Sequence, residues 1–333
     1  MIKPRDTSVI ISGIGSYAPP DVVTNQDLSK IVDTSDEWIW SRTGIRERRI
    51  AKNGENCSDM GTLAGRAAIK DAGIGIEDID LLIVATLTPD MLFPSTACLI
   101  QKKLGLRQIP SFDVGAACSG FLYSLHIGTQ MMQAGGYENI LIIGAEKLSS
   151  VLDWSDRSTC VLFGDGAGAI VLSQCDRPGV GILGTRLSAD GTESKILRMP
   201  GGGSAVPASE ESIGEGQHYL KMAGREVFKI AVRVMGQSAI GILDDHGVDP
   251  KDVACVIPHQ ANIRIIESMS ARLGLSMDKF LINLDRYGNT SAASIPIALE
   301  EAHRNGRVNS DEYILLTAFG AGLTWGACLI KWH

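Results

Sequence analysis

The sequence lacks the features that mark membrane and secreted proteins. No stretch approaches the roughly 20 consecutive apolar residues that a membrane-spanning helix needs. The opening residues, Met1–Asp6, contain no apolar run of the kind found in secretory signals. We therefore expect a cytoplasmic protein that has no membrane partner.

Disulfide and metal frameworks are missing as well. The seven cysteines are scattered and include no CxxC pair, which argues against a disulfide network and against a zinc cluster. The chain also lacks an excess of positive charge, since its formal net charge is −7. We therefore expect reduced thiols, no bound metal and no nucleic-acid partner.

What the chain does contain is an internal repeat at an offset of 174 residues. That offset aligns DAGIGIEDIDLLIVAT, which begins at Asp71, with DHGVDPKDVACVIPHQ, which begins at Asp245. It also pairs ENILIIGAE with the run that begins at Glu312, and SVIISGIGS with the run that begins at Ile182, one residue into GILGTRLSA. One offset shared by three segments predicts two similar halves, residues 1–178 and 179–333.

Each half alternates buried strands with helices. Continuous aliphatic runs predict strands at 81–85, 109–114, 140–143, 167–172, 253–257, 280–284 and 314–316. Helices are expected between the strands, for example over 119–134, 263–273 and 292–302. Two sheets sandwiched by helix layers satisfy this order. The segment 200–216 has no periodicity and is interpreted as a mobile surface loop.

One cysteine differs from the others in its surroundings. Cys118 follows the predicted strand 109–114 and three small residues, and it precedes the predicted helix 119–134. The start of a helix favours the thiolate, which is the reactive form of cysteine. We therefore interpret Cys118 as a nucleophile and the other six cysteines as structural residues.

A histidine and an asparagine follow strands in the second half. His259 comes after the strand 253–257, and Asn289 lies between the strand 280–284 and the helix 292–302. Ligands of open α/β sheets bind at the carboxyl ends of strands. Under the 174-residue offset Cys118 falls on Ala292, beside Asn289, so corresponding turns are expected to bring cysteine and asparagine together.

Two other interpretations of these motifs fit less well. A Cys–His–Asn set also occurs in papain-like proteases, but their cysteine signature is absent and Cys118 follows a buried strand. The glycine run Gly164–Gly168 precedes a strand, whereas a phosphate-binding loop precedes a helix. We interpret that run as a structural turn.

Taken together, several motifs closely resemble those of the β-ketoacyl-acyl-carrier-protein synthase III family. They are DTSDEWIWSRTGIRERR, DVGAACSGF, FGDGAGAIVL, IPHQANIRI, RYGNTSAASIP and FGAGLTWG. The resemblance covers essentially the whole chain. It implies the α/β thiolase fold, in which two duplicated halves form a five-layered αβαβα sandwich, and it implies a homodimer.

The implied activity is the initiating condensation of type II fatty acid biosynthesis. An acyl-coenzyme A, with acetyl-coenzyme A as the expected primer, and malonyl-acyl-carrier protein give 3-oxoacyl-acyl-carrier protein, coenzyme A and carbon dioxide. The acyl group is carried on Cys118, and His259 and Asn289 donate hydrogen bonds to the enolate. No metal or redox cofactor is needed. Two alternatives remain, namely a same-fold enzyme of secondary metabolism and a non-catalytic partner of carrier proteins.

The resemblance also implies further site residues. Backbone N–H groups at Cys118 and Ala321 are the implied oxyanion hole. Phe93 and Phe319 are the implied walls of the acyl pocket, with Phe93 reaching across the dimer interface. The implied coenzyme A contacts are Thr34, Trp38, Arg42, Arg157, Gly224, Phe228 and Asn262.

Clustered cations point to a docking surface for the carrier protein. Four of them recur every four residues and are expected to form one helical ridge: Lys221, Arg225, Lys229 and Arg233. Arg264 and Arg272 follow on the helix after His259. Because acyl-carrier proteins are acidic, we predict that Lys229, Arg264 and Arg272 contact one.

Overall fold

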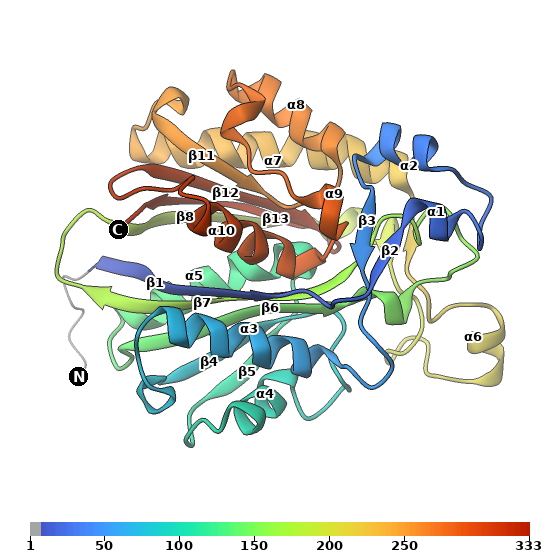
Figure 1. Ribbon diagram of the computed structural model, residues 1–333, viewed down its shortest axis with the longest axis horizontal. Helices are drawn as coiled ribbons and strands as arrows, with labels where there is room; N and C mark the ends of the chain where they lie inside the picture. The colour runs from blue at the N-terminus through green and yellow to red at the C-terminus, as the bar shows by residue number, and fades with distance from the viewer. Residues whose placement is uncertain (1–7) are drawn as a thin grey trace.

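The computed structural model describes residues 8–333 and consists of five alternating layers of helices and strands (Figure 1). One sheet has the strand order β1-β7-β6-β4-β5, and the other has the order β11-β12-β13-β8. The first is built from β1 (Ser8–Tyr17), β4 (Leu81–Ala85), β5 (Ser111–Val114), β6 (Asn139–Lys147) and β7 (Asp165–Cys175). The second is built from β8 (Gly181–Ala189), β11 (Val253–Pro258), β12 (Tyr313–Gly320) and β13 (Thr324–Lys331). This is the sandwich that the sequence predicted.

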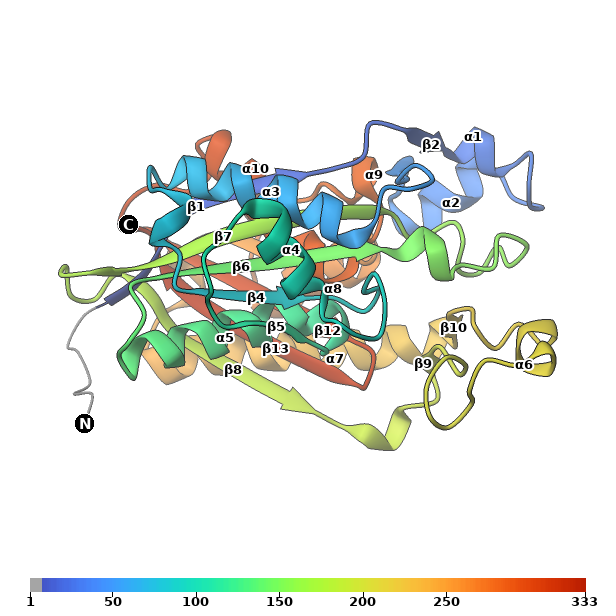
Figure 2. The ribbon, with the colours of Figure 1, turned by 90° about the horizontal axis from the view of Figure 1, so that it is seen from below.

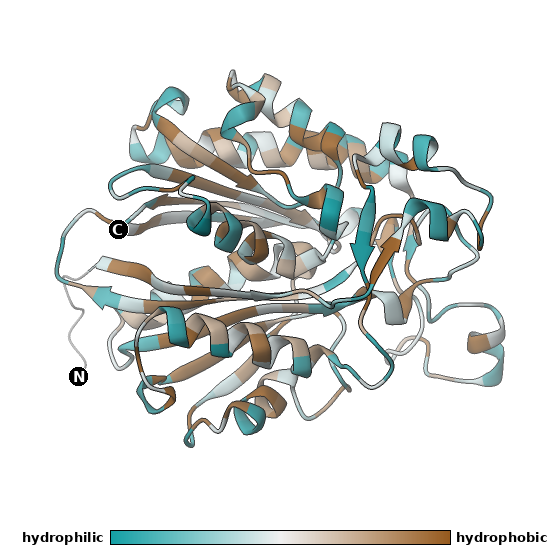
Figure 3. Cartoon of the chain, in the orientation of Figure 1, coloured by the Kyte–Doolittle hydropathy of each residue, from teal (hydrophilic) through white to brown (hydrophobic). Residues whose placement is uncertain are grey.

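The major helices form three layers around the two sheets (Figure 1), and the view from below shows one outer layer in front of the first sheet (Figure 2). The outer face of the first sheet is covered by α3 (Cys57–Asp71) and α4 (Thr96–Leu104), and that of the second by α7 (Gly224–His246) and α8 (Ile263–Leu273). Between the sheets lie α5 (Gly120–Gln133) and α10 (Ser294–Arg304). The central strands are therefore buried on both faces, which explains their continuous aliphatic runs (Figure 3).

Smaller elements surround these layers. Near one end, β2 (Val22–Thr24) pairs with β3 (Glu47–Arg49), and α1 (Asn25–Leu28) and α2 (Asp36–Thr43) lie between them in sequence. The second half adds β9 (Leu197–Arg198), α6 (Glu210–Gly214), β10 (Lys221–Met222) and α9 (Leu284–Tyr287). No helix within residues 8–333 is both long and apolar enough to cross a membrane.

The two halves repeat each other down to a single turn. The short 3₁₀ turns Ala117–Ser119 and Ser291–Ala293 are 174 residues apart, and each runs directly into a middle-layer helix. Their first residues share a conformation that is uncommon outside glycine, with φ of 50° at Ala117 and 49° at Ser291. The sequence offset therefore corresponds to a matching backbone.

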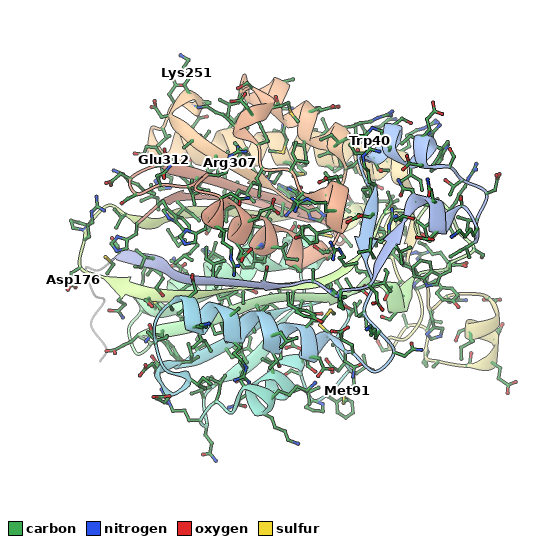
Figure 4. All side chains as sticks on the ribbon, viewed as in Figure 1. Trp40, Met91, Asp176, Lys251, Arg307 and Glu312 are labelled. Carbon is green, nitrogen blue, oxygen red and sulfur yellow. The ribbon has the colours of Figure 1, made fainter. Side chains whose placement is uncertain are left out.

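The boundary at residue 178 falls in the loop between β7 and β8, next to Asp176, which Figure 4 labels. Both halves contribute to one inner core, for example with Ile83 and Phe121 from the first and Ile257 and Leu299 from the second. The division into residues 1–178 and 179–333 thus describes a repeat within a shared core, and its boundary stays a prediction.

The strand predicted at 280–284 is wrong. Phe280 makes only an isolated bridge with Val256, and Leu284 already begins α9. The side chain of Gln260 supplies bonds that a neighbouring strand would otherwise make, because its amide donates to Leu281 O and its oxygen accepts from Asn283 N. A side chain can therefore replace a ladder partner, which an aliphatic run does not reveal.

The segment 200–216 contains more structure than the sequence predicted. It includes α6, which begins with a capping box at Ser209, and the Ser212 hydroxyl lies 2.9 Å from His218 Nε2. Pairing between β9 and β10 closes the excursion at its base. Apolar periodicity cannot detect a single helical turn, so this element was missed.

Candidate active site

Cys118 lies in the tight turn between β5 and α5. Its position is fixed by contacts with the loop after β12, where a Cβ on Gly320 would lie only 2.6 Å from Cys118 N. Two hydrogen bonds tie this loop to the turn: the Ser119 hydroxyl donates to Thr324 O at 3.0 Å, and the Thr324 hydroxyl donates to Ala116 O at 2.9 Å. The two backbone segments predicted to form the oxyanion hole therefore lie together.

His259 follows β11 and is held in one orientation. Its backbone N–H donates to Thr317 O at 2.7 Å, and its Nδ1 lies 2.7 Å from the hydroxyl of Ser294 on α10. That hydroxyl also accepts from Gln260 N–H at 3.5 Å. The Ser294 proton is then available to Nδ1, so the imidazole carries its own proton on Nε2. Burial lowers the pKa of His259 to about 3, which keeps the ring neutral.

Asn289 is oriented by its own turn. Its backbone N–H donates to Leu162 O, and its carbonyl accepts from Gly164 N–H. Its side-chain Oδ1 accepts from Ser291 N–H at 2.8 Å. With the oxygen engaged in this way, the amide N–H groups are the part of Asn289 that can donate to a ligand.

One cavity of about 490 Å³ collects Cys118, His259 and Asn289. All three side chains are largely buried, with exposed fractions of 8%, 2% and 7%. Ala321 and Phe319 line the same cavity, as do five of the predicted coenzyme A contacts: Trp38, Arg42, Gly224, Phe228 and Asn262. The described residues include no group of three or more His, Cys, Asp or Glu side chains that could hold a metal ion.

The resting form of Cys118 differs from the sequence argument. The start of α5 was expected to favour the thiolate, but burial raises the pKa of the thiol to about 12, opposed by a weaker hydrogen bond from Ser291. The neutral thiol is therefore the resting form. Any reaction at this sulfur requires a group that takes its proton.

Comparison with known proteins decides the family. A model described as 3-oxoacyl-[acyl-carrier-protein] synthase III matches residues 112–191, and the model of its C-terminal part matches residues 243–332. The β-ketoacyl-[acyl-carrier-protein] synthase III of Caldanaerobacter subterraneus subsp. tengcongensis is 54% identical over 322 residues, which are 97% of each chain. The chain belongs to this synthase III family.

Solved structures agree with this family membership. The 3-oxoacyl-[acyl-carrier-protein] synthase III of Aquifex aeolicus VF5 has a TM-score of 0.89 and 49% identity, over 98% of this chain and 100% of that chain. The priming β-ketosynthase of the R1128 polyketide biosynthetic pathway has a TM-score of 0.92 and 34% identity, over 100% of this chain and 98% of that chain.

Two coenzyme A contacts implied by the synthase III resemblance lie outside the cavity lining. The Arg157 guanidinium lies 5.2 Å from the Trp38 ring and donates to Asp33 O, so it must move aside if a base is to stack between it and Trp38. Thr34 has a buried hydroxyl without a hydrogen-bond partner. Arg42 also lies over Trp38, at 4.6 Å.

Phe93 does not line the cavity of its own chain. It is 82% exposed, in a loop that also exposes Leu92 and Met91, the last of which Figure 4 labels. Its predicted contact with a partner subunit's pocket remains a prediction.

The predicted basic ridge is partly wrong. Lys221 lies in β10, and α7 begins only at Gly224, so the helical ridge consists of Arg225, Lys229 and Arg233. Arg264 lies at the first turn of α8, next to the cavity residues Asn262 and Ile265. Arg272 is eight residues further on, about 12 Å along the helix, and its stem packs against Gly236 of α7.

Sequence reasoning missed several polar groups at this site. Arg198 lines the cavity from β9, just before the segment 200–216. Ser294 orients His259, and Ser291 hydrogen-bonds Glu146 and lines the cavity with Cys118. Glu146 had a signal in the sequence, because it is a charged residue at the end of the aliphatic run of β6. The structure shows that its side chain is fully buried, which is rare for a glutamate.

Proposed function

We propose that this chain catalyses the initiating condensation of fatty acid synthesis, transferring an acyl group from acyl-coenzyme A to Cys118 and then to malonyl-acyl-carrier protein. One observation carries the proposal. Cys118 shares a buried cavity with two neutral hydrogen-bond donors, His259 and Asn289, whose other polar atoms are already engaged. Such a pair suits an enolate oxygen, because it stabilises negative charge without first protonating it.

The first half-reaction takes place at the sulfur. Cys118 attacks the thioester carbonyl, and the tetrahedral oxyanion lies against backbone N–H groups of Cys118 and Ala321. Collapse of this intermediate releases coenzyme A and leaves acyl-Cys118. Trp38, Arg42, Gly224, Phe228 and Asn262 line the part of the cavity that we assign to coenzyme A, and Thr34 and Arg157 lie beside it. Coenzyme A is a substrate here, and the chemistry requires no metal or redox cofactor.

The second half-reaction forms the carbon–carbon bond. The malonyl thioester loses carbon dioxide, and the resulting enolate is stabilised by His259 Nε2–H and the Asn289 amide. Its carbon attacks acyl-Cys118, extending the chain by two carbons and expelling the cysteine sulfur. A neutral His259 is what this step needs, and burial supplies it.

Substrate delivery depends on surfaces outside the cavity. Arg264, Arg272 and Lys229 are exposed cations on α7 and α8, and they suit the acidic carrier protein. The exposed apolar loop at Met91–Phe93 suits the predicted homodimer, in which Phe93 would limit the acyl pocket of the partner. Phe319 would form the wall on the chain's own side. We place the enzyme in the cytoplasm, where its substrates are made.

Two alternatives differ in the acceptor or in activity. Identity to relatives named synthase III reaches 54%, against 34% for the priming enzyme of a polyketide pathway, which favours fatty acid synthesis. A non-catalytic binding partner has no need of the buried donors around Cys118.

The test combines labelling with product analysis. Iodoacetamide should alkylate Cys118, and prior incubation with acetyl-coenzyme A should protect it. Mass spectrometry of products from malonyl-acyl-carrier protein and a panel of acyl-coenzyme A primers should show 3-oxoacyl-acyl-carrier protein, with the best yield from acetyl-coenzyme A. Labelling without protection, together with no condensation product, would contradict the proposal.

A further inference from the structure

A buried carboxylate lies next to the active-site cysteine. Glu146, near the end of β6, is fully buried and accepts hydrogen bonds from Leu87 N–H at 3.0 Å, Thr88 N–H at 3.2 Å and the Thr88 hydroxyl at 2.7 Å. The Ser291 hydroxyl donates to its other oxygen at 3.1 Å. All of these donors are neutral, so they hold the ionised carboxylate without removing its basicity.

Ser291 connects this carboxylate to the sulfur. Its hydroxyl donates to Glu146 Oε1, and Ser291 lines the same cavity as Cys118, whose thiolate its hydroxyl would stabilise. A hydroxyl has one proton to give and lone pairs with which to accept. When Ser291 gives its proton to Glu146, it is able to receive the proton of the Cys118 thiol.

We propose that Glu146 accepts, through the Ser291 hydroxyl, the proton that Cys118 must lose before it attacks a thioester. The proposal rests on the proposed function, because it assigns the proton of the acylation step. In this relay the Cys118 S–H bond breaks as an O–H bond forms on Ser291. The former Ser291 proton moves to Glu146 Oε1. The site keeps a single negative charge, which passes from the carboxylate to the sulfur.

The proton returns later in the cycle. Coenzyme A leaves as a thiolate and takes its proton from solvent, while Glu146 stays neutral beside acyl-Cys118. Condensation then expels Cys118 as a thiolate, which recovers the stored proton through Ser291. Over the whole reaction one proton is consumed from solvent, as decarboxylation of a malonyl anion together with release of neutral coenzyme A requires.

Neighbouring groups support this direction of transfer. Burial raises the pKa of Glu146 to about 7, whereas burial lowers that of His259 to about 3, so the carboxylate is the stronger base. The Glu146 charge itself opposes the Cys118 thiolate, and the transfer neutralises that charge.

Other titratable groups around Glu146 do not compete for the proton. Cys57 on α3 stays a thiol, because burial raises its pKa and its sulfur bonds to Thr86 and to Ala145 O. The ammonium of Lys147 is directed to backbone oxygens of Glu55 and Lys52.

The test follows acylation of Cys118 by acetyl-coenzyme A in single turnovers between about pH 5.5 and 9.5. In the parent the rate should rise with pH to a plateau, with its midpoint near the pKa of Glu146, about 7. Ser291→Ala and Glu146→Gln should each slow acylation by about 10²-fold, the usual contribution of a general base. Their rates should lose this midpoint and keep rising with pH. Condensation of acyl-enzyme prepared by long incubation should stay close to the parent rate.

A second serine–carboxylate pair supplies a matched control. The Ser149 hydroxyl donates to the buried carboxylate of Asp165 at 2.6 Å, and neither residue lines the cavity. Ser149→Ala should keep the parent midpoint. A second measurement needs only the parent enzyme, namely its acylation rate in mixtures of H2O and D2O. A relay of two protons predicts that this rate depends on the deuterium fraction along a curve.

The outcomes separate this proposal from the proposed function. A parent that forms no acyl-enzyme contradicts the function itself. Variants that acylate at the parent rate with the parent midpoint overturn the relay and leave the function standing. An equal loss of acylation and condensation with an unchanged midpoint also overturns it, because that pattern belongs to a structural role.

Discussion

The two halves of the molecule have the same turn at the same place, but the turns carry different side chains. Around the first turn the chain reads Gly115, Ala117, Cys118 and Gly120; at the 174-residue offset the second turn has Asn289, Ser291, Ala292 and Ser294. His259 likewise corresponds to Ala85. At each of these pairs one half carries the reactive or polar side chain and the other carries a small residue.

Space between the turns explains this division. A Cβ on Gly120 would lie 3.1 Å from the Ala85 Cβ, and at the equivalent place in the second half the Ser294 hydroxyl meets His259 Nδ1. A Cβ on Gly144 would lie 2.3 Å from Ala292 O. Close packing at Gly120 and Gly144 therefore favours small residues in the first half. Duplication therefore provided two frames, and each became specialised for one part of a single site.

The largest effect is expected from moving the nucleophile. Cys118→Ala should abolish acyl-enzyme formation, and adding Ala292→Cys to it should not restore acylation, because Ala292 does not line the cavity that holds Cys118, His259 and Asn289. Mass spectrometry of the intact protein after incubation with acetyl-coenzyme A measures this. An acylated double variant would show that the turns are chemically interchangeable.

The next largest effect concerns the side-chain amide of Asn289, which lies at the position equivalent to Gly115. Asn289→Ala should still acylate but lose decarboxylation by about 10²–10³-fold, the usual effect of removing one oxyanion donor. Asn289→Asp should lose more, because it keeps an acceptor for Ser291 N–H but presents negative charge to the enolate. Release of carbon dioxide from malonyl-acyl-carrier protein is the measurement. Equal rates in the parent and Asn289→Asp would remove Asn289 from the mechanism.

Much of this specialisation could be predicted from the sequence, because its signals come from residues that are close together along the chain. The offset, the strand–turn–helix setting of Cys118 and the positions of His259 and Asn289 depend on nearest neighbours along the chain, and the structure brings the three together. Ser294 and Glu146 were missed because their roles depend on partners 35 and 145 residues away. The wrong strand at 280–284 has the same cause, since Gln260 replaces a strand from more than 20 residues away.

His259, unlike its counterpart Ala85, should make the free energy of unfolding depend on pH. His259 has a folded pKa of about 3 against an ordinary 6.5, so the unfolded chain binds a proton that the folded chain does not. The free energy of unfolding therefore falls as the pH drops below 6.5, by up to about 1.4 kcal/mol per pH unit. Glu146 acts in the opposite direction, because its raised pKa favours the folded state below about pH 7.

Removing the imidazole isolates this effect. In His259→Asn the acid-induced loss should shrink, so the difference in unfolding free energy between parent and variant should change steadily from pH 7 to 4.5. Urea unfolding at several pH values measures it. Parallel curves for the two proteins would mean that folding does not lower the pKa of His259.

A smaller effect is expected on primer length, which we assign to Phe93 in the first half. Phe93→Thr removes a ring from the exposed loop after β4, which we assign to the partner's acyl pocket. Preference should shift toward longer acyl-coenzyme A primers, by about tenfold, since one or two methylenes of pocket space change selectivity by that order. Competition between acetyl- and hexanoyl-coenzyme A reports the shift. An unchanged profile in the folded variant would show that Phe93 does not limit the acyl pocket.

The smallest effect should place carrier-protein docking in the second half. Reversing one rim charge typically alters association and its salt dependence more than it alters chemistry, so Lys229→Glu or Arg264→Glu should raise KM for malonyl-acyl-carrier protein by about fivefold. Acylation by acetyl-coenzyme A should be nearly unchanged for Lys229→Glu.

Arg264→Glu is a less specific test of docking, because the Arg264 guanidinium donates to Ser41 O at 2.9 Å, next to Arg42. Arg272→Glu offers a graded comparison on the same helix, since Arg272 lies about 12 Å further than Arg264 along α8, away from the end that contributes Asn262 and Ile265 to the cavity. If docking is centred on the mouth, Arg272→Glu should raise KM less than Arg264→Glu does, and added salt should weaken carrier-protein use most in the parent. Equal KM values and equal salt slopes in all three variants and the parent would make these cations an ordinary solvated surface, and docking would then have to be sought in the first half.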